Sequence, residues 1–346
     1  CSKESIVRRY DHEVQGGSVV KPFTGARDDG PSDAAVVRPI LDSFEGVVVS
    51  NGIIPRYSDI DTYAMAANSV DEAMRNYVAV GGDPGHAAAL DNFCWCDPVK
   101  SEKTPDGEHK LAQLVRANRG LYDAVTAYGI PLISGKDSMK NDYIMGEVKI
   151  SIPPTLLVTV IGRMEDVRLS VTMDLKKAGN YLYVLGETAD ETGGSEYYAH
   201  LGYVGSRVPT VDFVKARDRY ERYHRALQSG VVRSCHDCSD GGMAVALAEM
   251  AFAGDVGLSV DLDLVPVSGE LREDAVLFSE TASRLLVEVE PSHSPKFEEI
   301  MGDTQWARIG QCTGDKRLVI TNVDRDVMAL SLEEMKEAWQ GTLRGL

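Results

Sequence analysis

The chain has 346 residues, enough for two domains of ordinary size, and its 43% hydrophobic and 26% charged residues exclude a disordered chain. No apolar run approaches the ~20 residues that a membrane-spanning helix needs. A net charge of −17 without a dense cluster of lysine and arginine argues against nucleic-acid binding, and six cysteines are too few for a disulfide scaffold and indicate a reducing, cytoplasmic setting.

The predicted elements of the first unit follow an irregular lead-in over residues 1–28, which opens at Cys1 without a methionine, as expected of a piece of a longer chain. The β-branched run Val47 to Val49, followed by Asn51-Gly52, predicts a hairpin over 43–55. Further along, the pattern predicts a helix over 61–82, a strand over 86–95, a helix from 109 that stops at Gly129, a buried strand over 130–133 and a strand over 155–164.

A second unit is predicted after a shift in composition over 165–179. Its elements are a strand over 180–188, a helix over 211–229, and strands over 257–266, 284–291 and 316–322. We therefore expect an α+β fold in two domains, residues 29–168 and 169–346, after the lead-in.

The stretch CHDCSDGGMAVALAEMAFAG (235–254) carries the densest polar motif. Asp237 and Ser239 ahead of Gly241-Gly242 suit a loop that holds Mg²⁺ and a phosphate at a helix start. The same residues also suit a plain helix-capping turn. A zinc site of Cys235, His236 and Cys238 completed by Cys94 or Cys96, or a redox pair of cysteines, are further alternatives that the pattern leaves open.

Other polar residues have spacings that suit ligand binding. Glu72 and Asn76 lie at i and i+4 of a predicted helix, so both oxygens leave one face, as in a Mg²⁺ ligand pair or a solvated helix face. Asp33 alone is an ordinary turn residue. Glu280 and Arg284 have the spacing of a structural ion pair.

Two loops after predicted strands could hold a nucleotide. In LISGKDSMKND, Gly135 allows close backbone approach, Lys136 could neutralise a phosphate and Ser138 could hydrogen-bond one. Within 86–95, where an apolar strand runs into a loop, Asp91 follows the apolar residues and precedes Phe93. Both loops could equally be polar turns.

Together the motifs resemble one family. YDHEVQGGSVVKP, AVGGDPGHAAALDNFCW, GIPLISGKDSMKND, HDCSDGGMAVALAEMAFAG and LFSETASRLLVEV are similar, in this order, to the second half of the synthetase portion of phosphoribosylformylglycinamidine (FGAM) synthase. That family uses ATP to convert formylglycinamide ribonucleotide (FGAR) to FGAM in purine biosynthesis. The resemblance implies a fold like aminoimidazole ribonucleotide (AIR) synthetase, with an N-terminal α+β domain that contributes to a pseudo-dimeric barrel and a C-terminal α/β domain.

The resemblance also implies roles for individual residues. In the family, an auxiliary site holds a tightly bound ATP or ADP with Mg²⁺. The residues of this chain that match the metal ligands of that site are Asp33, Glu72, Asn76 and Asp237. Those that match nucleotide contacts are Asp91, Gly135, Lys136 and Ser239, and Ser138 matches a substrate contact. Lys136 stands where small forms have a metal-ligating Asn, and a charged lysine cannot ligate Mg²⁺, so we assign it a phosphate contact.

No match to the family's catalytic histidine is found among the seven histidines, so no catalytic residue is assigned to this chain. We expect it to be inactive alone and to need a first synthetase half and a glutamine amidotransferase as partners, or to pair with itself as a homodimer. Neither nucleic acid nor membrane is an expected partner. The alternatives are a nucleotide-stabilised structural half and a stand-alone kinase or synthetase of the same superfamily.

Overall fold

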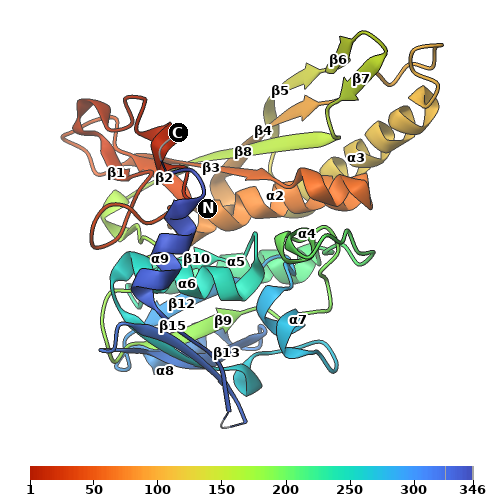
Figure 1. Ribbon diagram of the computed structural model, residues 1–346. Coiled ribbons are helices and arrows are strands. Elements are labelled where there is room, and N and C mark those ends of the chain that lie inside the picture. Colours follow the sequence, from red (N-terminus) through yellow and green to blue (C-terminus); the bar gives the residue numbers. More distant parts are fainter. Residues whose placement is uncertain (324, 345–346) are drawn as a thin grey trace.

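A computed structural model describes residues 1–323 and 325–344, which form two units, each built on one main sheet (Figure 1). The first sheet has the order β1-β2-β3-β8-β4-β5. Its strands are β1 (Ser18–Val20), β2 (Ala34–Val37), β3 (Gly46–Ile53), β8 (Thr155–Met164), β4 (Ala87–Cys94) and β5 (Leu132–Ser138). All neighbouring strands are antiparallel except β4 and β5. The hairpin β6 (Asp142–Met145) and β7 (Val148–Ser151) extends beyond this sheet.

Two helices, α2 (Thr62–Ala79) and α3 (Gly107–Tyr128), accompany the first sheet, and α2 lies between this sheet and the second unit (Figure 1). The side chain of Asp61 caps α2 by accepting from the backbone of Tyr63. Small residues let α2 lie close to its neighbours: a Cβ on Gly120 of α3 would stand 2.4 Å from the carbonyl of Tyr63. The buried side of the sheet includes Val158 and Val160.

The second sheet has the order β10-β12-β9-β13-β11-β14-β15. Its strands are β9 (Tyr181–Leu185), β10 (Val232–Asp237), β11 (Gly257–Asp261), β12 (Leu285–Val289), β13 (Trp306–Thr313), β14 (Arg317–Asn322) and β15 (Arg325–Ser331). The helices of this unit are α4 (Glu196–His200), α5 (Phe213–Gln228), α6 (Gly242–Gly254), α7 (Glu273–Phe278), α8 (Ser294–Met301) and α9 (Leu332–Gly341). None of the described helices has the length and apolar character to cross a membrane.

The lead-in is more ordered than expected from its sequence. It contains α1 (Glu4–Val7) and β1, and β1 pairs with β2 of the first sheet. It also contacts the far end of the chain, because Ser2 donates to the carbonyl of Trp339. Directly after the lead-in, Asp29 pairs with Lys336 at 2.6 Å. Residues 165–180 connect the two sheets, and the domain boundary at about residue 168 remains a prediction.

The α+β fold class is confirmed, and the predicted helices appear as α2, α3 and α5. The expected strands over 86–95, 155–164 and 180–188 appear as β4, β8 and β9, and those at 257–266, 284–291 and 316–322 as β11, β12 and β14. Strands β13 and β15 and helices α8 and α9 had no counterpart among the predicted elements.

Two expectations were wrong. The hairpin over 43–55 does not form: β3 runs straight through Asn51-Gly52, and Gly52 is needed for packing, since a Cβ there would stand 2.1 Å from the carbonyl of Ser69. The strand expected to be buried over 130–133 is the edge strand β5, where Ile133 is 62% exposed. Consecutive residues of β5, which point to opposite faces of the sheet, are exposed, because no described element covers either face at this strand.

The packing of Gly52 gives a first prediction. In Gly52→Ala the new methyl group meets the backbone of Ser69 and Ala73, so α2 must shift, and we expect a loss of about 1–3 kcal/mol in the free energy of unfolding. Urea denaturation measures it. Gly314→Ala is the matched control, because open space surrounds Gly314. Equal stability of the two variants would contradict this packing role.

Candidate cation and nucleotide site

Three acidic or imidazole side chains meet at the junction of the two units. Asp33 directly precedes β2 and is contributed by the first unit, while His236 and Asp237 end β10 of the second. Their ligand atoms all lie within 4.8 Å of one another, and within residues 1–323 and 325–344 this is the one such group of three. His236 and Asp237 therefore belong to a strand end, and the loop begins after them.

His236 is held between two carboxylates. Its Nδ1 lies 2.6 Å from Oδ1 of Asp33, and its Nε2 lies 3.0 Å from Oε2 of Glu249. Burial opposes a charge on the ring, but the two carboxylates outweigh it and raise the pKa of His236 well above its ordinary value. Because both ring nitrogens are engaged by carboxylates, His236 holds Asp33 in place.

Two buried oxygens among the predicted metal ligands have no hydrogen-bond partner. They are Oδ2 of Asp33 and Oδ1 of Asn76. Asp33 uses its other oxygen for His236, and Asn76 uses its amide nitrogen to donate to the carbonyl of Asn51 at 3.1 Å. Buried polar atoms are usually paired, so these two oxygens, which are among ten unpaired side-chain atoms in the described residues, are free to take a ligand.

Glu72 supplies a further carboxylate from the same face of α2 as Asn76. It lies outside the group of three, and its Oε2 accepts from the backbone of Ile53 at 2.7 Å. Burial raises its pKa well above the ordinary value; Arg75 opposes this shift, and the charges of Asp237 and Asp240 add to it. A carboxylate that is destabilised in this way gains from a nearby divalent cation, and carboxylate and amide oxygens are ligands that suit Mg²⁺.

The two glycines after Ser239, Gly241 and Gly242, shape the loop, and their backbone N–H groups are both used in hydrogen bonds within the chain. Gly241 and Gly242 both have left-handed backbones, at φ 82° and 65°. The N–H of Gly241 donates to Oε1 of Glu280 at 2.8 Å, and that of Gly242 to the carbonyl of Ser239. The hydroxyl of Ser239 donates a long hydrogen bond of 3.4 Å to Oδ1 of Asp237, which places Ser239 beside the candidate site.

The cysteines near this loop do not form the alternative sites. All six are free thiols, and Cys235 and Cys238 are buried. Burial raises the pKa of both thiols, which disfavours the thiolate that zinc binding or disulfide exchange requires. Cys94 lies on β4 of the other unit and belongs to no described metal-ligand group.

The remaining predicted residues form a second set on β4 and β5. In the parallel register Asp91 pairs with Gly135, Asn92 with Lys136, and Cys94 with Ser138. A Cβ on Gly135 would stand 2.9 Å from Oδ1 of Asp91, so the glycine allows this contact, and Lys136 hydrogen-bonds Ser138. No described hydrogen bond or ion pair joins this set to Asp33 or Ser239, so the predicted nucleotide contacts divide between two places.

The expected ion pair between Glu280 and Arg284 is wrong. Arg284 donates to the carbonyls of Thr281 and Ser279, and Glu280 accepts from the backbone of Gly241 and Glu196. Since these residues lie between α7 and β12 and not within a helix, the i, i+4 spacing does not bring them together.

The comparisons with known proteins agree with this architecture. A family model described as "AIR synthase related protein, N-terminal domain" matches residues 31–164, and one described as "AIR synthase related protein, C-terminal domain" matches residues 177–322. The chain belongs to the AIR synthase related family.

Relatives of this AIR synthase related chain include the phosphoribosylformylglycinamidine synthase subunits PurL of Methanocaldococcus jannaschii and Deinococcus radiodurans. The M. jannaschii protein is 36% identical over 342 residues, which cover 98% of this chain and 44% of that protein. The D. radiodurans protein is 35% identical over 355 residues, which cover 100% of this chain and 45% of that protein. The PurLQS structure from Thermotoga maritima shares the fold, with a TM-score of 0.72 at 18% identity over 96% of this chain and 48% of that one. The resemblance to FGAM synthase is thus confirmed, and the chain spans about half the length of the curated relatives it matches.

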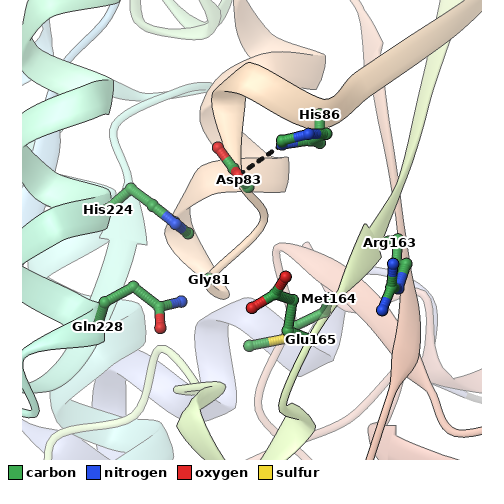
Figure 2. Close-up of a pocket in the computed structure, with 8 residues that line it drawn as sticks. All are labelled: Gly81, Asp83, His86, Arg163, Met164, Glu165, His224 and Gln228. Carbon is green, nitrogen blue, oxygen red and sulfur yellow. Dashed lines mark hydrogen bonds and ion pairs between the residues drawn. The ribbon is translucent and has the colours of Figure 1, made fainter.

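A separate cavity of about 310 Å³ lies elsewhere on the AIR synthase related fold (Figure 2). It is lined by Gly81, Asp83, His86, Arg163, Met164, Glu165, His224 and Gln228. Asp83 pairs with His86 at 2.9 Å, but in the part of the chain that the structure describes these imidazoles and carboxylates do not converge as a metal-ligand group. The junction at Asp33 and Asp237 is therefore the better candidate site.

The carboxyl of Glu280, which holds the loop after Ser239, gives a pH prediction. Burial raises its pKa from 4.5 to about 7. The folded chain keeps this proton where the unfolded chain has lost it, so the stabilisation is present at low pH and is lost as pH rises from 4.5 through 7. Glu280→Gln cannot titrate, and we expect its stability relative to the wild type to rise by about 3 kcal/mol across this window.

Urea denaturation at a series of pH values measures that change. The control is Glu102→Gln, which replaces an exposed carboxyl and is expected to leave the pH dependence unaltered. A difference between Glu280→Gln and the wild type that stays constant from pH 5 to 8 would contradict the assignment.

Proposed function

We propose that this chain is the second half of the synthetase portion of FGAM synthase, an ATP-dependent C–N ligase that converts FGAR to FGAM in purine biosynthesis. Its PurL relatives align with almost the whole chain, and T. maritima PurL, which has the same fold, has been solved complexed with FGAR, with ADP and with ATP. The observation that carries the proposal is the pair of unpartnered oxygens on Asp33 and Asn76, which a bound cation would pair. The free thiols are consistent with the expected cytoplasmic setting.

In this proposal Asp33, Glu72, Asn76 and Asp237 hold Mg²⁺, and Ser239 contacts a nucleotide phosphate. The cation would neutralise the carboxylates of the junction and the phosphates of ATP or ADP together. Because Asp33 and Asp237 come from different units, the bound nucleotide would also fasten the two units to each other. The site would then serve the structure of the enzyme as well as nucleotide binding.

The set on β4 and β5 would serve the catalytic site of a complete enzyme. Asp91 and Gly135 would contact ATP, Lys136 a phosphate, and Ser138 the substrate FGAR. Gly135, Lys136 and Ser138 lie on the edge strand β5, whose Leu132 and Ile133 are exposed, and Asp91 lies on the neighbouring strand β4. The hairpin of β6 and β7 exposes further large apolar side chains: Tyr143, Ile144, Met145, Val148 and Ile150. Such a face suits an apolar interface.

We propose that another AIR synthase related unit covers this face. In the complete enzyme it would be the first synthetase half, which would supply the catalytic histidine, while a glutamine amidotransferase would supply ammonia. The isolated chain would use the same face to form a homodimer. The PurL relatives are more than twice as long as the matched region, which leaves room for that first half.

The alternative of a nucleotide-stabilised structural half is favoured by one observation. His236, the histidine at the junction, is engaged through both ring nitrogens and offers neither for proton transfer to a substrate. The alternative of a stand-alone kinase is less well supported, because the matched relatives are FGAM synthase subunits.

The cation site predicts Mg²⁺-dependent nucleotide binding. We expect ADP to bind the wild-type chain with Mg²⁺ and to lose at least tenfold in affinity in Asp237→Asn, because the cation loses a charged ligand. Isothermal titration calorimetry with and without EDTA measures this. Asp42→Asn, at an exposed position, should bind as the wild type does. Equal ADP affinity with EDTA would count against a Mg²⁺ site.

The proposal also predicts that activity needs a second part. Purified alone, the chain should form no FGAM from FGAR, ATP and ammonium, since no catalytic histidine is assigned to it. Product formation is followed by mass spectrometry. The control is the full-length relative from M. jannaschii, assayed under the same conditions. Appreciable product from the isolated chain would refute its incompleteness.

A further inference from the structure

The buried carboxylate of Asp71 on α2 lies at the centre of a hydrogen-bond network that spans both units. It accepts from the hydroxyls of Tyr128 at 2.5 Å and Tyr220 at 2.7 Å, and from the backbone N–H and the hydroxyl of Ser283 at 2.9 and 2.8 Å. It also accepts from Nη1 of Arg75 at 2.6 Å. Five donors leave Asp71 no freedom to reorient.

The partner in this network, Ser283, holds a left-handed backbone at φ 61° although it is not a glycine. Such a conformation costs free energy and persists where the surroundings enforce it. Here Asp71 enforces it, since both polar groups of Ser283 donate to this carboxylate. The network is therefore a rigid base that joins α2 to the segment before β12.

Arg75 extends this base to the candidate site. It lies one helical turn after Asp71, is 3% exposed, and donates through Nε to Oδ2 of Asp237 at 3.1 Å. The guanidinium thus bridges a carboxylate of the first unit and one of the second. A lysine could not do the same, because its single ammonium lacks the planar array of donors that spans two carboxylates.

The contact determines which oxygen of Asp237 is available. Oδ2 accepts from the guanidinium of Arg75, whereas Oδ1 accepts only a 3.4 Å hydrogen bond from the hydroxyl of Ser239 and lies 3.7 Å from Nδ1 of His236. In Asp33, Oδ1 is engaged by His236 and Oδ2 has no partner. Each carboxylate thus has one oxygen tied by a cationic side chain, while the other is unpaired in Asp33 and bonded only to Ser239 in Asp237.

We propose that Arg75, anchored by Asp71, is a positioning residue that presents Oδ1 of Asp237 to the divalent cation. The inference rests on the proposed function, because it assumes that the junction binds Mg²⁺ with a nucleotide. Arg75 touches neither the cation nor the nucleotide in this account and acts through Asp237.

The positive charge of Arg75 and its positioning of Asp237 predict opposite effects on Mg²⁺ affinity when Arg75 is removed. A positive charge beside a cation site repels the cation, so by Coulomb's law alone its removal should tighten Mg²⁺ binding. If Arg75 instead orients Asp237, its removal should weaken Mg²⁺ binding, on the order of tenfold, as is found when groups that orient metal ligands are removed. The sign of the change therefore separates the two.

The experiment measures the affinity of the 346-residue chain for Mg²⁺ at a fixed, saturating concentration of ADP, by displacement of Mn²⁺ followed by electron paramagnetic resonance. Arg75→Met and Arg75→Lys are compared with the wild type. We expect both variants to bind Mg²⁺ about tenfold more weakly. Arg75→Lys keeps the charge, so it tests position alone, and it also serves if Arg75→Met fails to fold.

Arg284→Met is the matched control. Arg284 is fully buried like Arg75, but it donates to the carbonyls of Thr281 and Ser279 and to the hydroxyl of Thr188, and to neither carboxylate of the network. Its loss should lower stability without changing Mg²⁺ affinity.

Three outcomes would overturn the inference. Unchanged or tighter Mg²⁺ binding in both Arg75 variants would refute positioning while leaving the proposed function intact. An equal loss of affinity in Arg284→Met would show that the effect is general destabilisation. A wild-type chain that binds no Mg²⁺ with ADP would overturn the proposed function, and the inference with it.

Discussion

The ion pairs of Arg75 are the contact on which the junction of the two units depends. A guanidinium removed from water is costly unless its charge is compensated, and removal of one partner of a buried pair typically costs about 3–5 kcal/mol. Arg75 meets this requirement with one carboxylate from each unit, Asp71 and Asp237. Neither unit can move relative to the other without leaving a buried charge unpaired, so the same contact joins the units and orients the site.

More carboxylates than cationic side chains lie at this junction. Arg75 and His236 together compensate part of the charge of Asp33 and Asp237, and Glu72 and Asp240 add more negative charge nearby. In the proposed function a divalent cation would balance what remains and would pair the two unpartnered oxygens. The proposed nucleotide site would then follow from how the units are joined, so that a structural and a catalytic role would coincide there.

Helical spacing and β-branched runs were enough to predict α2, α3, α5 and six of the described strands, because these patterns report which face of an element is buried. The errors have a common physical cause, which is that long-range packing decides what a local pattern leaves open. Asn51-Gly52 has the composition of a turn, but Gly52 is small because α2 crosses it. Ile133 has the composition of a core strand, but it lies at a sheet edge.

The candidate site shows the same limit. Glu72 and Asn76 could be paired by their spacing, but nothing in the local sequence indicates that Asp33 lies beside His236, 203 residues later. The family resemblance supplied that link. Arg75 and Asp71 were missed as part of the site, although their i, i+4 spacing within the same helix was a visible signal for an ion pair. Their role depends on Asp237 and Ser283, which only the tertiary structure brings into contact.

The central claim is that the oxygens of Asp33, Asn76 and Asp237 surround a divalent cation. Anomalous diffraction from crystals grown with Mn²⁺ and ADP tests it most directly, because manganese is located independently of any interpretation of the protein. The account predicts an anomalous peak at this junction, within bonding distance of Oδ2 of Asp33, with the nucleotide phosphates beside Ser239. Manganese and nucleotide found instead on β4 and β5, with the junction empty, would contradict it.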